Sequence, residues 1–164
     1  MAKKPFIPIP PMADLPPAEE INVSELLDKY LSGEIDLICV LGPTASGKTR
    51  YAVRLARQIN ELLSNSQYEK SGCCGSEGPE PHSSLTSGAE IISADSRQVY
   101  RGMDIGTGKD LSEYEEIPYH LMDIVDAGTK YNIFEYQRDF EKAYKDIRDR
   151  GGIPILCGGS GLYI

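Results

Sequence analysis

The chain has 164 residues, of which 40% are hydrophobic and 26% are charged, and this length favours one domain with a proper core over two. Its formal net charge of −8 argues against broad affinity for nucleic acid, because phosphate neutralisation needs clustered Lys and Arg, so any such contact must be local. No apolar run approaches the ~18 residues of a membrane span, prolines interrupt any N-terminal signal, and the four cysteines lack metal-ligand spacing, so we expect a cytoplasmic protein without structural zinc or disulfides.

The first part of the chain predicts an arm, a helix and a strand. Residues 1–21 hold six of the eleven prolines and predict a disordered arm. A short helix follows, with Asn22 or Ser24 as its N-cap and with apolar residues at helical spacing up to Leu31. Residues 36–41 are almost continuously apolar, which is typical of a central strand covered on both faces by helices.

Directly after that strand, the sequence Gly-Pro-Thr-Ala-Ser-Gly-Lys-Thr has the pattern of a phosphate-binding loop, with an ordinary glycine-rich turn as the alternative. Glycines at both ends let the backbone curl, so that its N–H groups and the start of the next helix, which extends to about Leu63, can hold a phosphate group. Lys48 supplies a point charge, and Thr49 places a hydroxyl where a Mg²⁺ ion bridging the phosphates would sit. We expect all eight residues to bind a diphosphate or a nucleotide: Gly42, Pro43, Thr44, Ala45, Ser46, Gly47, Lys48 and Thr49.

A second chemical segment lies at the end of the next predicted strand. Residues 64–88 are rich in Ser and Gly and predict a disordered insertion, in which His82 has no ligand role. The strand 89–95 then ends in Asp95, and ligands of open α/β sheets gather at the carboxyl ends of strands. We therefore expect Asp95 to face the phosphate-binding loop, with capping of the following turn as the alternative role. The glycine-rich residues 101–110 predict a loop near the same site.

The remaining segments continue an alternation of strands and helices. Residues 119–124 predict a short strand, in which His120 is a structural residue rather than a metal ligand. Asn132 is the expected N-cap of an amphipathic helix that ends near residues 151–152, and residues 153–157 predict another buried strand. This alternation predicts an α/β fold with a mostly parallel central sheet.

Four stretches of this sequence resemble the tRNA dimethylallyltransferases, also called tRNA isopentenyltransferases. They are GPTASGKT at 42–49, ISADSRQVYRGMDIGTGKD at 92–110, YHLMDIVD at 119–126 and GGSGLYI at 158–164. The resemblance implies a three-layer fold like that of P-loop NTPases, in truncated form, with residues 22–164 as the N-terminal portion of the catalytic domain. It also implies transfer of a dimethylallyl group from dimethylallyl diphosphate to N6 of the adenosine adjacent to the tRNA anticodon, with Mg²⁺ as cofactor.

The resemblance implies roles for single residues as well. Lys48 and Thr49 are then catalytic residues that stabilise the leaving diphosphate, and Asp95 is the general base that accepts a proton from the adenine amine. The residues expected to contact tRNA are Asp95, Ser96, Arg97, Gln98 and Ser160. Ser160 stands where the family usually has threonine, so that the hydroxyl is kept and a methyl group is lost.

The family pattern continues beyond the last matching stretch into a basic region that grips the tRNA anticodon arm, so the resemblance implies that this chain is the N-terminal part of a larger enzyme. The positive groups near the site are few, namely Lys48, Arg97, Arg101 and Lys109. We therefore expect the 164 residues by themselves, as a monomer, to bind diphosphate but not to transfer a prenyl group to tRNA.

Three alternatives stay open at this point. Small-molecule kinases use the same kind of loop, and in such an enzyme Asp95 would activate an acceptor hydroxyl. Adenylate isopentenyltransferases share the prenyl chemistry but act on a free nucleotide, which Ser96, Arg97 and Gln98 disfavour. The third alternative is an inactive, phosphate-binding fragment of the transferase.

Overall fold

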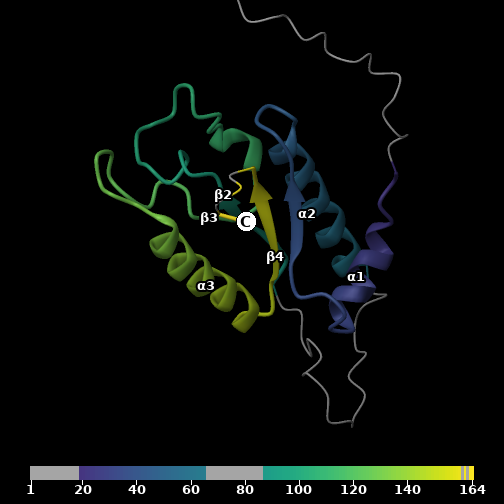
Figure 1. Cartoon of the computed structure of the whole chain (residues 1–164). Coiled ribbons are helices and arrows are strands. Elements are labelled where there is room, and N and C mark those ends of the chain that lie inside the picture. Colours follow the sequence, from purple (N-terminus) through teal and green to yellow (C-terminus); the bar gives the residue numbers. More distant parts are fainter. Residues whose placement is uncertain (1–18, 66–86, 160, 162) are drawn as a thin grey trace, which may run out of the picture.

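The computed structural model describes residues 19–65, 87–159, 161, 163 and 164, which form a parallel β-sheet with helices on both faces (Figure 1). In chain order the elements are α1 (Val23–Leu31), β1 (Ile38–Leu41), α2 (Lys48–Ser64), β2 (Ala89–Ala94), the 3₁₀ helix η2 (Leu111–Tyr114), β3 (Tyr119–His120), α3 (Ile133–Asp149) and β4 (Ile153–Gly158). The predicted α/β class is confirmed. None of the helices in the described ranges is both long and apolar enough to cross a membrane.

The sheet has the strand order β1-β4-β2-β3, and each neighbouring pair is parallel. Strand β4 is the last in sequence but lies inside the sheet, where Ile155 pairs with Ile38 of β1 on one side and with Ile91 of β2 on the other. Within the described residues, β1 lies at an edge of the sheet rather than at the predicted central position. Its end is open, with Leu41 50% exposed. An apolar run is compatible with either position, so composition alone cannot decide the strand order.

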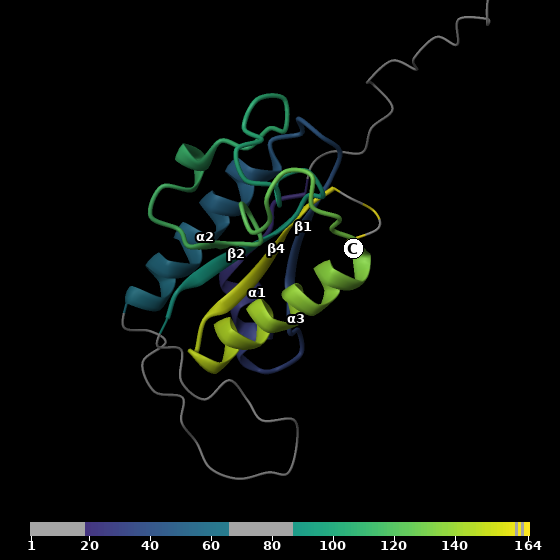
Figure 2. The same ribbon diagram turned by 90° about the vertical axis from the view of Figure 1, so that its left-hand side faces the viewer.

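Helices α1 and α2 cover one face of the sheet and α3 covers the other, as the two views in Figures 1 and 2 show. Neighbouring residues of β4 enter two separate cores, since Ile155 packs with α1 and α2 whereas Leu156 packs with α3. The same division applies to Ile91 and Ile92 of β2. Both strands therefore bury side chains on both faces, which explains why each has an almost continuous apolar sequence.

The starts of two helices follow directly from local sequence. The side chain of Asn22 accepts hydrogen bonds from the N–H groups of Ser24 and Glu25, so Asn22 rather than Ser24 is the N-cap of α1. At α3, Asn132 and Glu135 form a capping box, in which each side chain bonds the backbone N–H of the other residue. The predicted N-cap of α3 is confirmed.

The strand predicted over residues 119–124 is shorter in the structure. Only Tyr119–His120 pair with β2 in the described sheet. Leu121 and Asp123 have φ angles of 62° and 53°, and this left-handed backbone cannot continue a strand. The apolar composition of the segment instead reflects burial of Leu121 and Met122 in the two cores.

The proline arm and the insertion lie mostly outside the described residues, and His82 lies outside them too, so the disorder expected there stays a prediction. The edges of the insertion differ from the predicted range 64–88. Ser64 is the last residue of α2. Ser87 donates its N–H to the carbonyl O of Gly151 at 3.3 Å, so this end of the insertion is bonded to the start of the segment that leads into β4.

A buried ion-pair cluster lies toward the amino ends of the strands. Glu90 of β2 is 3% exposed, and its carboxylate accepts hydrogen bonds from Arg150 at 2.7 and 3.1 Å and lies 2.7 Å from Nε2 of His120. Burial alone would raise the pKa of Glu90, but the hydrogen bonds with Arg150 and His120 outweigh burial and lower the pKa. The structural role predicted for His120 is confirmed.

Candidate active site

The phosphate-binding loop joins β1 to α2 and turns sharply before the helix. Ala45 and Gly47 have φ angles of 63° and 80°, left-handed conformations that curl the backbone. Gly47 is the N-cap of α2, and no side chain in the described part of the chain caps this helix. Uncapped N–H groups at the start of a helix attract anions through their hydrogen bonds and the helix dipole. The local geometry therefore fits a bound phosphate group.

Lys48 folds back over this loop, and its Nζ donates a hydrogen bond to the carbonyl O of Pro43 at 2.6 Å. Gly159, which follows β4, lies so close that a Cβ there would come within 2.4 Å of the Gly42 carbonyl O and 3.5 Å of Lys48 Nζ. Burial raises the pKa of the Cys157 thiol to about 11, although the charge of Lys48 opposes this shift. The ammonium group of Lys48 therefore lies near the carboxyl end of β4.

A cavity of about 470 Å³ opens between the phosphate-binding loop, the carboxyl ends of β2 and β4, and the loop 101–110. Its walls bring together side chains that are far apart in sequence, among them Lys48, Thr49, Asp95 and Glu113. A volume of this size is typical of sites for small molecules. The sheet therefore places the loop and the carboxylate of Asp95 around one space.

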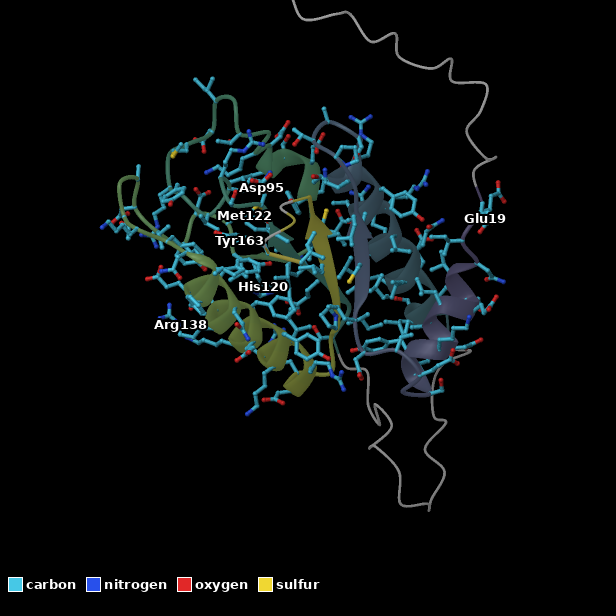
Figure 3. The ribbon with its side chains drawn as sticks, in the orientation of Figure 1. Glu19, Asp95, His120, Met122, Arg138 and Tyr163 are labelled. Carbon is cyan, nitrogen blue, oxygen red and sulfur yellow. The ribbon has the colours of Figure 1, made fainter. Side chains whose placement is uncertain are left out.

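Asp95 follows directly after β2, at the carboxyl end of this strand, and Figure 3 labels its side chain. Its Oδ1 accepts a hydrogen bond from the N–H of Arg97 at 2.9 Å, and Nε of the Arg97 side chain lies 3.7 Å from the same oxygen. The Asp95 side chain is 23% exposed. Asp95 therefore both bonds the following turn and lines the cavity, so the two roles considered from the sequence coexist.

The three residues expected to contact tRNA after this carboxylate have different surroundings. Ser96 and Arg97 lie on the surface, whereas Gln98 is 8% exposed. The amide of Gln98 is held at both ends, because its Oε1 accepts a hydrogen bond from Ser93 Oγ at 3.1 Å and its Nε2 donates one to Gly108 O at 3.3 Å. The polar groups of Gln98 thus bind within the protein, although the side chain also borders the cavity.

Two residues that no sequence pattern indicates also line the cavity, namely Glu113 and Tyr114 of η2. Burial raises the pKa of Tyr114, and a hydrogen bond with the Thr49 side chain opposes this shift. The local signal for η2 is Asp110, whose side chain caps it, but nothing in the sequence places this short helix beside the phosphate-binding loop. Ser160, the remaining residue expected to bind tRNA, lies outside the described residues.

The oxygen atoms around the cavity fit a magnesium ion. The Thr49 hydroxyl and the carboxylates of Asp95 and Glu113 border the same space, and Mg²⁺ prefers oxygen ligands completed by water and phosphate. Within the described ranges, no group of three or more His, Cys, Asp and Glu side chains could hold a metal ion by itself. The donor set therefore fits an ion held jointly with a phosphate rather than a closed protein site.

Known proteins resemble this chain in both sequence and structure. The model of the IPP transferase family matches residues 98–164. A tRNA dimethylallyltransferase 2 from Bacteroides fragilis is 50% identical over 135 residues, which cover 80% of this chain and 35% of that protein. The crystal structure of the full-length tRNA isopentenylpyrophosphate transferase from Bacillus halodurans superposes with a TM-score of 0.59 at 36% identity, over 78% of this chain and 33% of that one. A eukaryotic dimethylallyltransferase acting on tRNA superposes with a TM-score of 0.56 at 29% identity, over 79% of this chain and 25% of that one.

The similarities to these proteins each cover about 80% of the chain. The chain spans about a third of the length of the Bacteroides and Bacillus relatives. The structural neighbours have a fold like that of P-loop NTPases, so the predicted fold is confirmed. By its sequence and by its fold, the chain belongs to the tRNA dimethylallyltransferase family.

Proposed function

We propose that this chain holds the diphosphate and the general base of an enzyme that transfers a dimethylallyl group from dimethylallyl diphosphate to N6 of the adenosine adjacent to the tRNA anticodon. The observation that carries the proposal is that the phosphate-binding loop and Asp95 line one cavity of about 470 Å³. The class of reaction is supported by a relative named tRNA dimethylallyltransferase that is 50% identical.

The phosphate-binding loop would act on the leaving group. As the allylic C–O bond breaks, negative charge grows on the diphosphate, and preorganised donors stabilise this charge most strongly in the transition state. Lys48 and the N-terminus of α2 are such donors. A bound Mg²⁺ ion, held by Thr49 together with phosphate oxygens, would neutralise further charge on the diphosphate.

Asp95 would act on the nucleophile. An exocyclic adenine amine is a weak nucleophile, and a carboxylate within hydrogen-bond reach of its N–H can accept the proton as attack on the allylic carbon proceeds. The N–H of Arg97 holds Oδ1 of Asp95 in a fixed position at 2.9 Å. The proton of N6 therefore passes to the Asp95 carboxylate while the diphosphate leaves at the opposite side of the carbon.

The tRNA anticodon arm would bind across the mouth of this cavity. Arg97 and Arg101 have side chains that are 49% and 56% exposed and can pair with phosphates, although Arg101 also pairs with Asp126 at 3.0 Å. Such contacts are local, as the net charge of −8 requires. We further propose that Ser96 and Ser160 contact the displaced base, and that the protein acts as a monomer in the cytoplasm.

Calorimetric titration with inorganic diphosphate in the presence of Mg²⁺ tests the first half of the proposal. We expect binding to the parent protein and at least about tenfold weaker binding to Lys48→Ala, because a charge-assisted hydrogen bond contributes about 1.5–3 kcal/mol. Equal affinity in the two proteins would contradict a role for the loop in binding diphosphate. Phosphoryl transfer from ATP to a small acceptor would instead favour the kinase alternative.

Labelled dimethylallyl diphosphate, Mg²⁺ and unmodified tRNA test the second half. We expect no incorporation of label into tRNA by the 164 residues alone, because transfer requires the tRNA to be held over a large surface. Full-length protein should incorporate label, and its Lys48→Ala variant should not. Failure of the full-length protein would favour the inactive, phosphate-binding alternative.

A further inference from the structure

The loop 101–110 contains a lysine whose ammonium group lies inside the protein. The Lys109 side chain is fully buried, and its Nζ donates hydrogen bonds to Tyr100 O at 2.9 Å, to Asp104 Oδ1 at 2.9 Å and to the carboxylate of Asp123. These three acceptors use all three N–H bonds of the ammonium group. Lys109, counted from the sequence among the positive groups near the site, therefore uses its charge within the protein.

Through these acceptors Lys109 joins three segments. Tyr100 ends the turn that follows β2, Asp104 lies at the tip of the loop, and Asp123 follows β3. The backbone joins two of the same segments, because the N–H of Asp123 donates to the carbonyl O of Gln98 at 3.1 Å. Lys109 is thus the point at which the turn, the loop and the strand end meet.

A chain of contacts leads from this lysine to the proposed base. Gly108, its neighbour in sequence, accepts a hydrogen bond from Gln98 Nε2 at 3.3 Å. The N–H of Gln98 in turn donates to the carbonyl O of Asp95 at 3.2 Å. A shift of Lys109 would therefore reach the backbone of Asp95 through two hydrogen bonds.

The charge of this lysine has a role that packing does not explain. Burial alone would lower the pKa of Lys109, but the hydrogen bonds to Asp123 and Asp104 outweigh burial and raise the pKa, so the group stays charged. An apolar side chain of similar volume would fill the same space without the cost of removing an ion from water. The ion pairs add directional bonds that an apolar side chain lacks.

We propose that Lys109 is a positioning residue, which holds the turn from Asp95 to Gln98 at the rim of the cavity so that the Asp95 carboxylate meets the adenine amine. Lys109 is not among the described residues that line the cavity, so it acts through Gly108 and Gln98 rather than by touching substrate. The inference rests on the proposed function only for the catalytic role of Asp95. Whether Lys109 holds the turn in place does not depend on that role.

Hydrogen exchange of backbone amides in Lys109→Met tests the hold on the turn. We expect the amides of Arg97 and Gln98 to exchange at least about tenfold faster, while the amides of β2 and β4 stay unchanged, because local opening does not require global unfolding. Lys142→Met, at an exposed position of α3, is the matched control and should change neither group. Unchanged exchange in the turn, or a uniform increase that includes β4, would overturn the proposal.

A second variant, Asp123→Asn, keeps the inference testable if Lys109→Met does not fold. It retains the shape of the side chain and removes the charge that pairs with Lys109. The amides of Arg97 and Gln98 should again exchange faster than those of β4, by a smaller factor than in Lys109→Met. Exchange equal to that of the parent protein would overturn the proposal.

Single-turnover prenyl transfer by the full-length protein separates positioning from binding. Lys109→Met should lower the transfer rate by about 10²-fold, the effect of a misplacement near 1 Å, and leave the affinity for inorganic diphosphate within about twofold. An unchanged rate, or an equal loss of rate and affinity, would overturn the proposal. If Asp95→Asn transfers at the parent rate, the proposed function fails, and the exchange measurement still decides whether Lys109 holds the turn.

Discussion

The two ends of the sheet contain similar charged side chains in different surroundings. Toward the amino ends of the strands, Glu90 is 3% exposed, and Arg150 and His120 both contact its carboxylate. At the carboxyl ends, Asp95 is 23% exposed and borders a cavity together with Lys48. A carboxylate whose partners all come from the protein stabilises the fold, whereas one that borders a cavity can exchange a proton with a ligand. Both residues are carboxylates. Burial and the identity of the contacting groups, rather than residue type, therefore distinguish the structural cluster at Glu90 from the candidate active site at Asp95.

The largest expected effect is on catalysis. Asp95→Asn should lower the single-turnover transfer rate of the full-length protein by about 10²–10⁴-fold, because the proposed general base is lost, and leave diphosphate affinity nearly unchanged. Asp28→Asn, at an exposed position on α1, is the control and should transfer at the parent rate. A parent-like rate in Asp95→Asn would show that Asp95 is not the general base. The carboxylates at the two ends of the sheet would then not differ in function as proposed.

A substitution toward the amino ends of the strands should lower the stability of the fold rather than the transfer rate. Glu90→Ala should lower the free energy of unfolding by about 2 kcal/mol, because Arg150 and His120 lose a buried, charged hydrogen-bond partner. Glu61→Ala, at an exposed site on α2, should change stability by less than about 0.5 kcal/mol. Urea unfolding measures the stability of both variants. A loss of diphosphate affinity in Glu90→Ala without a loss of stability would contradict the division between a structural end and a ligand-binding end of the sheet.

A third change tests how closely β4 supports the phosphate-binding loop. Gly159→Ala should weaken diphosphate binding about tenfold or more, because the new Cβ would lie 2.4 Å from Gly42 O and the loop must move, at a typical cost of about 1–3 kcal/mol. Gly161→Ala is the matched control, since a Cβ there meets no described atom within 4 Å. Equal affinities in the two variants would show that the loop tolerates the shift.

The smallest expected effect is a pH dependence of stability at the amino ends. The pKa of Glu90 is lowered in the folded protein, so its contribution is fully present above its ordinary value of 4.5 and is lost as the pH falls through the lowered value. The stability difference between the parent and Glu90→Gln should therefore narrow between about pH 7 and about pH 3. Thermal unfolding of the two proteins across this pH range measures the difference. A difference that widens on acidification would mean that the pKa of Glu90 is raised rather than lowered in the folded protein.

Local rules in the sequence determined much of the fold and part of the site. The glycine-rich turn before α2, the N-cap Asn132 and the alternation of strands with helices follow from the preferences of neighbouring residues, and the structure has all three. Asp95 is found at the end of β2 because strand-end residues of a parallel sheet share one edge, a rule that needs no contact information.

Only the tertiary structure decided the strand order, the burial of Lys109 and the entry of Glu113 into the cavity. Each depends on segments that are distant in sequence, and local preference does not distinguish the possible outcomes. A lysine in a glycine-rich loop has the same backbone preferences whether it faces water or the interior. Lys109 can be buried because the carboxylates of Asp104 and Asp123 compensate the cost of removing its ammonium group from water. Only the folded chain brings those two carboxylates to Lys109.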